Sequence, residues 1–318
     1  MQFYIGDILD AVRRDTHNVS WTDDVDNREG TTTNSLLRWA NWAQEHAQGK
    51  ISKTYPIFFE AEEEIDIVGD QATYIVSDNV YLGSRIRLVE YSRSGSVRDY
   101  VRLKPFNPYN KLNSSGNPQC YHRQNGSIRV GPVPDVSAGT LRVTYERKLD
   151  RLDIRRGLVQ GVTLAGGQLT ALSIDIAEDN FDATALEAAT HLCLCDSYGT
   201  VKMYNIPITS IDSTTGIVTL SAFTYAEGED ADAGDYVTVG KFTTTHSALV
   251  DDFERYISEY VARRMLYKDS SADAFDVGDE FRTLEAELVD SMKIPDKDVR
   301  ELHQSDMDPI LYGSTEDY

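Results

Sequence analysis

Residues 59–78, FEAEEEIDIVGDQATYIVSD, predict two β-strands joined by a turn at Gly69 and Asp70. Side chains alternate in direction along a strand, so the first strand has one apolar face and one acidic face. The apolar face holds Ile57, Phe59, Ala61, Ile65 and Ile67, and the other holds Phe58, Glu60, Glu62, Glu64 and Asp66. A strand with this much negative charge raises the question of what lies beside it.

The same alternation continues beyond this hairpin and predicts two β units. Residues 55–149 form the first, with further strands at RIRLVEYS, VRDYVRLK, SIRVGPV and TLRVTYER. Residues 157–242 form the second, with strands at LVQGVTL, QLTALSID, HLCLCDS, TVKMYNIPI, GIVTLSAF and YVTVGKF. The regular spacing of strands and turns in the second unit predicts an inserted small β sandwich or barrel.

Helical spacing of apolar residues marks both ends of the chain. The repeats are Ile5, Ile8, Leu9 and Val12; Leu36, Ala40, Ala43 and Ala47; Leu249, Phe253, Ile257 and Val261; and Val277, Phe281, Leu284 and Leu288. Trp39 and Trp42 lie on different faces of the second helix, so we expect one in the core and the other against a neighbouring element or chain. The fold class is α+β, with a helical bundle formed by the N- and C-terminal helices.

Four regions follow from these patterns. Residues 1–156 combine helices with the antiparallel β unit, residues 157–242 are the inserted domain, residues 243–295 are the C-terminal helices, and residues 296–318 are an extended acidic arm. The arm carries an apolar group, Ile310, Leu311 and Tyr312, that it is too short to bury. We expect these three residues to dock on a partner.

The composition restricts the function. With 41% hydrophobic residues in 318, the chain can bury a substantial core, and its net charge of −21 disfavours gripping DNA or anionic membranes. An acidic wall could still let DNA slide past without binding. Neither a membrane-spanning run nor a signal peptide is recognisable, so we expect synthesis in the cytoplasm and no membrane contact.

Signs of enzymatic or metal chemistry are weak, and we predict no catalytic, cofactor or metal residues. Glu62 and Glu64 could form an acid and base pair, as in glycosidases, but same-face strand carboxylates are ordinarily solvated. Two further sets of residues leave an alternative open: Cys193 and Cys195 are buried thiols or a metal pair, and the acidic segment 227–235, with Asp230, Asp232 and Asp235, is a solvated loop or a calcium site.

Basic residues cluster in the first β unit at Arg85 and Arg87, followed by Arg93, Arg98, Arg102 and Lys104. Their alternation with apolar residues predicts an outward basic face. This face either makes cross-strand ion pairs within the chain or meets the row Glu60, Glu62 and Glu64 of a neighbouring copy. Contact between two different faces of identical subunits suits a ring.

The order of several segments resembles the head-to-tail adaptor, or connector ring, proteins of tailed bacteriophages. These segments are SLLRWANWAQEHAQ, FFEAEEEIDIVGDQATYIVSDNV, GSIRVGPVPDVSAGTLRVTYERKLDRL and LVDDFERYISEYVARRML, and they lie within residues 1–153 and 244–292. Val76, Ser77 and Asp78 depart from a Leu-Pro-Asp sequence of the family. Residues 157–242 have no counterpart in it, which leaves open whether the inserted domain carries other virion proteins or belongs to the subunit interface.

The resemblance implies a non-enzymatic virion protein at the portal vertex between head and tail, in a ring of twelve subunits. Such a ring joins the portal protein to tail or other neck proteins, and DNA passes through its lumen without sequence-specific binding. Glu60, Glu62, Glu64, Arg85 and Arg87 would then lie at the subunit interface or the lumen, and Ile310, Leu311 and Tyr312 would dock on the portal or a neighbour. The alternatives are a carbohydrate-binding or glycan-cleaving β protein and an acidic DNA mimic.

Overall fold

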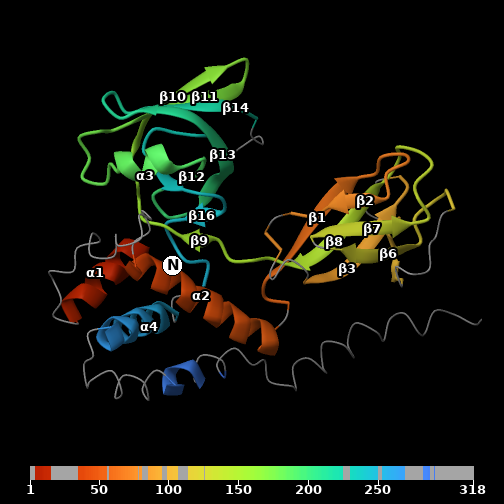
Figure 1. Ribbon diagram of the computed structural model, residues 1–318, viewed down its shortest axis with the longest axis horizontal. Helices are drawn as coiled ribbons and strands as arrows, with labels where there is room; N and C mark the ends of the chain where they lie inside the picture. The colour runs from red at the N-terminus through yellow and green to blue at the C-terminus, as the bar shows by residue number, and fades with distance from the viewer. Residues whose placement is uncertain are drawn as a thin grey trace, which may run out of the picture.

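The computed structural model of the chain has a mixed α+β fold (Figure 1). It describes residues 4–15, 35–55, 57–77, 79–80, 85–94, 99–106, 114–124, 126–224, 230–249, 253–268, 282–286 and 290. Strands predominate over helices in these residues. The α+β class predicted from the sequence is therefore confirmed.

Three longer helices pack together: α1 (Ile5–Asp15), α2 (Ser35–Thr54) and α4 (Phe253–Lys268). The predicted apolar lines of all three are buried in one core, which also receives Phe59, Leu149 and Leu152 from the chain between the helices. Leu284 packs against this core, whereas Val277, Phe281 and Leu288 of the fourth predicted helix lie outside the described residues. The complete helical bundle is accordingly not confirmed.

The first β unit consists of two four-stranded sheets that share one core (Figure 1). One sheet has the order β1 (Glu60–Asp66), β8 (Thr140–Glu146), β3 (Ile86–Ser92), β4 (Val101–Arg102), and the other β2 (Thr73–Ile75), β7 (Ser127–Gly131), β6 (Cys120–Gln124), β5 (Lys104–Pro105). Burial alternates along β1 as predicted, but Ile57 is 66% exposed because residues 57–59 form a turn before the strand begins. The sequence did not predict β6, since Tyr121 is its only buried side chain.

The inserted segment forms a six-stranded antiparallel sheet with its own core. Its order is β10 (Val159–Ala165), β11 (Gln168–Ile174), β14 (Ile217–Phe223), β13 (Val201–Asp212), β12 (His191–Cys195), β15 (Tyr236–Val239). The first half of β13 pairs with β12 and the second half with β14, and Asn205, at the change of partner, has a left-handed φ of 58°. Backbone hydrogen bonds from residues 157–159 to residues 234–237 connect the two outermost strands of this order.

The prediction for this segment was a small β sandwich or barrel. Its strands form one continuous sheet rather than the two stacked sheets of a sandwich, and the barrel alternative stays a prediction. All six strands expected from the sequence are present. The short helix α3 (Ala183–Ala188) was not expected, although Asp182 is an N-cap residue that accepts a hydrogen bond from the Ala185 N–H.

The two connections between the inserted sheet and the rest of the chain run side by side. They form the parallel pair β9 (Arg151–Leu152) and β16 (Thr243–Thr244). Side-chain amides of α2 hold the first connection: Asn41 bonds to both backbone groups of Leu152, Gln44 Nε2 donates to the Asp150 carbonyl at 2.7 Å, and Gln48 Nε2 donates to the Arg147 carbonyl at 2.7 Å. All three amides are buried. The helix thereby satisfies the backbone polar groups of an otherwise unpaired edge.

Charged residues also fasten the inserted sheet to this connection. Arg156 is buried and pairs with Asp153 and Asp182, and Asp153 accepts a hydrogen bond from the Val239 N–H at 2.8 Å. The guanidinium of Arg155 stacks on the rings of Tyr4 and Tyr236, at 4.4 and 4.0 Å from their centroids. Contacts of several kinds therefore restrict motion of the inserted sheet against the helices.

Candidate assembly surfaces

The acidic face of β1 lies beside arginines of the same chain. Glu60 Oε1 is 3.3 Å from Arg87 Nε, and Glu64 Oε1 accepts hydrogen bonds from Arg142 Nη2 at 3.1 Å and the Tyr100 hydroxyl at 3.0 Å. Glu62 Oε1 is 3.5 Å from the Thr144 hydroxyl. These bonds from Tyr100 and Arg142 lower the pKa of the Glu64 carboxyl. The cross-strand neighbours on β8 thus supply part of the positive charge that the acidic row needs.

Arg85 and Arg87 converge on a carboxylate that the sequence did not single out. Glu146 is fully buried at the end of β8, and its Oε2 is 3.5 Å from Arg85 Nη1 and 3.3 Å from Arg87 Nη2. Glu60 and Glu146 are directly opposite in the register of β1 and β8. Arg87 pairs with both carboxylates and thereby offsets the repulsion between these two like charges.

The sequence left open whether the basic face makes ion pairs within the chain or meets the acidic row of a neighbouring copy. The ion pairs described above correspond to the first alternative. Arg142 and Glu146 were missed, although their even spacing of four in TLRVTYE places both on one face of a strand. Which strand would face β1 could not be read from spacing, because β8 follows β1 by more than seventy residues. A contact of the Glu60, Glu62 and Glu64 row with a second subunit or a lumen stays a prediction.

The carboxylates considered for chemistry are engaged in structural contacts. The lowered pKa of Glu64 opposes the raised pKa that a general acid requires. In the acidic segment, Lys202 Nζ lies 3.0 Å from Asp232 Oδ2 and 2.9 Å from Asp235 Oδ1. A lysine therefore already supplies the cation at the position considered for calcium.

Cys193 and Cys195 are free thiols in the core of the inserted sheet. Burial raises the pKa of the Cys195 thiol to about 12, so it stays protonated at neutral pH. Within the described residues, no group of three or more His, Cys, Asp or Glu side chains is placed to hold a metal ion. The buried-thiol interpretation agrees with this environment.

Two aromatic residues of α2 show the division expected from the sequence. Trp39 is buried in the helical core, and Trp42 is 42% exposed. Arg38 and Arg264 lie over the Trp42 ring, at 5.3 and 5.8 Å from its centroid.

No described helix is both long and apolar enough to cross a membrane. Ile310, Leu311 and Tyr312 lie outside the described residues.

The described helices and the antiparallel β unit follow one another in the order predicted for a head-to-tail adaptor. Residues 4–159, just under half of the chain, match the family model described as SU10 adaptor protein, so this part of the chain is similar to that family. The match confirms the resemblance to phage head-to-tail adaptors and ends where β10 begins. A search of curated proteins found no match.

Proposed function

We propose that the protein forms a ring at the portal vertex of a phage virion and joins the portal protein to the tail. The observation that carries this proposal is the family match over residues 4–159, which include α1, α2 and the whole first β unit. The role is structural and non-enzymatic. Twelve subunits, the number implied by the resemblance, would surround a lumen through which DNA passes.

The net charge of −21 supports this use of the lumen. Binding to DNA is strengthened mainly when cationic side chains neutralise phosphates and release counterions. A predominantly acidic wall lacks that attraction, so DNA can move along it without being held. Glu60, Glu62 and Glu64, with Arg85 and Arg87, are proposed to lie at this wall or at the subunit interface.

The acidic arm, residues 296–318, is proposed to dock through Ile310, Leu311 and Tyr312 on the portal or on a neighbouring subunit. The inserted domain is proposed to span residues 157–242, and residues 243–295 to complete the adaptor core. In support, every member of the inserted core lies between Val159 and Val239, and the helical core contains none of them.

Mass photometry of the protein, alone and mixed with the portal protein of the same genome, tests the proposal. We expect a discrete high-mass species with portal. A chain that stays monomeric in both samples contradicts direct portal docking. A variant truncated after Pro295 tests the arm, because loss of the complex in this variant but not in the full chain assigns docking to residues 296–318.

A further inference from the structure

Charge is segregated along this acidic chain. Residues 100–134 contain five Lys and Arg and no Asp or Glu, whereas residues 157–201 contain six Asp and Glu and no Lys or Arg. The first stretch belongs to the β unit of the family match, and the second belongs to the inserted sheet. Two oppositely charged surfaces on one chain can attract each other between copies.

The basic surface lies on the outer side of the first β unit. Arg102 and Lys104 are exposed on either side of the buried Leu103, and the exposed Arg129 on β7 is directly opposite His122 on β6. Within the described part of the chain, the side chains of Arg102, Lys104 and Arg129 have no acidic partner. We call Arg102, Lys104, His122 and Arg129 the basic end.

The acidic surface is formed by the segment between β11 and α3 together with α3 itself. Asp179 and Glu187 are exposed, and Asp175 and Glu178 are half-buried. Asp182 of this region pairs with Arg156, but the other four carboxylates have no cationic partner among the described residues. We call Asp175, Glu178, Asp179 and Glu187 the acidic end.

Each charged end also carries an exposed apolar side chain. Val101 is 66% exposed beside Arg102, and Ile176 is 49% exposed beside Asp175. Val101 borders a surface hollow of about 530 Å³, which Tyr91, Pro118, Arg93 and Asp99 also line. Apolar contact at the centre with charges around it is the usual anatomy of a specific interface.

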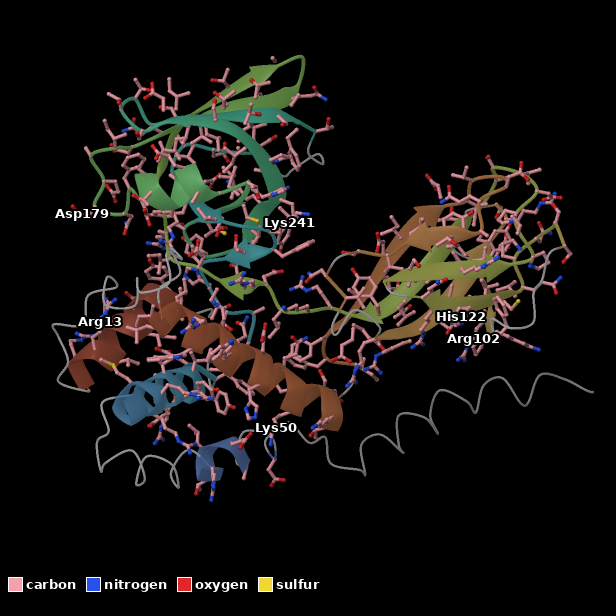
Figure 2. The ribbon with its side chains drawn as sticks, in the orientation of Figure 1. Arg13, Lys50, Arg102, His122, Asp179 and Lys241 are labelled. Carbon is pink, nitrogen blue, oxygen red and sulfur yellow. The ribbon has the colours of Figure 1, made fainter. Side chains whose placement is uncertain are left out.

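The two ends lie far apart on one molecule. Figure 2 shows Asp179 on the left of the view, beside the inserted sheet, and Arg102 and His122 on the right, in the first β unit. An isologous contact built on either end alone would bring like charges together. Opposite charges on opposite sides of the molecule favour a heterologous, head-to-tail contact, which closes into a ring when the rotation permits.

We propose that the acidic end of one copy docks on the basic end of the next, with Ile176 entering the hollow beside Val101. The partner is a second copy of this chain, and the inference rests on the proposed ring. It assigns the inserted sheet to the subunit interface.

Crosslinking between copies tests the contact directly. One chain carries Val101→Cys and a second, of different tag mass, carries Ile176→Cys, both with Cys120→Ser to remove the partly exposed thiol; Cys193 and Cys195 are fully buried. A short bismaleimide should join the two chains when they are mixed, alone or with portal protein. No crosslink in either condition overturns the proposal.

Charge exchange tests the electrostatic part. Lys104→Glu with Arg129→Glu should lower the crosslinked yield at least tenfold, as should Glu178→Lys with Asp179→Lys. The two reversed chains are then mixed, with Val101→Cys in the chain that carries Lys104→Glu and Arg129→Glu, and Ile176→Cys in the chain that carries Glu178→Lys and Asp179→Lys. This mixture should restore the yield to within about threefold of the parent pair. The matched control, Arg14→Glu with Lys53→Glu on exposed helix positions, should leave it unchanged.

The outcomes separate this inference from the proposed function. Formation of the portal complex without any crosslink refutes the head-to-tail contact and leaves the adaptor role standing. Crosslinking without a portal complex supports the contact and counts against portal docking. Reversed pairs that fail to restore the yield show that the charges do not face each other, and the inference is then wrong.

Discussion

Gln44 shows how one side chain joins two segments that are far apart in sequence. Its Nε2 donates to the Asp150 carbonyl at 2.7 Å, and its Oε1 accepts from the Ser247 hydroxyl at 2.8 Å. Asp150 precedes the inserted sheet and Ser247 follows it, so this amide connects both passes of the chain to α2. Gln44 is itself buried, and water cannot replace either bond.

Gln44→Ala should therefore reduce the free energy of unfolding by roughly 2–4 kcal/mol, because it leaves the buried Asp150 carbonyl without this donor and the Ser247 hydroxyl proton without this acceptor. Urea denaturation followed by circular dichroism measures the change. Glu45→Ala is the matched control, since its ion pair with Lys148 is solvent-exposed and contributes at most about 1 kcal/mol. Equal effects of the two substitutions would contradict the role assigned to the amide.

Asp150 is a buried carboxylate in the same connection. Burial raises its pKa, although Arg147 and the hydrogen bond from the Tyr204 hydroxyl act in the opposite direction. A folded-state pKa above the unfolded value means that the carboxyl favours folding most when protonated. This contribution is complete below the unfolded pKa and is lost as the pH rises through the folded pKa.

Asp150→Asn should consequently unfold at a higher temperature than the parent at pH 7, and the difference should shrink as the pH falls toward 4. Thermal melts at several pH values measure it. Asp153→Asn provides the contrast, because Asp153 pairs with the buried Arg156 and its neutralisation should destabilise the fold at pH 7. If Asp150→Asn proves destabilising at pH 7, burial does not dominate at this carboxyl.

At the scale of elements, local sequence patterns predicted where the strands lie better than they predicted which strands pair. Strand alternation located β1, β3, β7, β8 and all six strands of the inserted sheet, because a half-buried strand must alternate. β6 was missed because CYHRQ buries one side chain, and α3 because it has only six residues. The amides Asn41, Gln44 and Gln48 were missed because the Ala line beside them accounts for a helix on its own.

The pairing of β1 with β8 determines which charges surround the acidic row, and no local signal specifies it. Glu64 faces Arg142 only because the register places them opposite each other. Candidate residues could thus be named from the sequence, as Glu60, Glu62 and Glu64 were, but their neighbours could not. The family resemblance predicted the order of the elements and the class of protein, but it gave no information on residues 157–242.

The inserted sheet should be removable as an element. A chain in which a short Gly/Ser linker replaces residues 157–242 should retain the helices and the first β unit, because neither of their cores contains a residue from this range. The β9–β16 pair holds the cut ends next to each other. Circular dichroism and a cooperative thermal transition measure folding, and an unfolded product would show that the inserted sheet supports the remainder.

At the scale of the whole molecule, charge is distributed unevenly rather than merely in excess. A net charge of −21 by itself predicts repulsion between copies. At the basic end, an approaching acidic surface meets cationic side chains that have no acidic partner among the described residues. It lies in the first β unit, on the other side of the molecule from Asp179, so each copy has one basic and one acidic surface (Figure 2).

Salt should separate the attraction between these ends from the general repulsion. Raising the ionic strength from about 0.1 M to about 1 M shortens the Debye length from about 10 Å to about 3 Å. Screening of net repulsion alone would strengthen association between copies. If the acidic and basic ends attract each other, high salt removes the contribution of two or three exposed ion pairs, each worth about 0.5 kcal/mol. The dissociation constant then rises roughly tenfold. Analytical ultracentrifugation measures this change. The chain without residues 157–242 lacks the acidic end, so it should show no such rise, and an equal rise in both chains would place the salt-sensitive contact elsewhere.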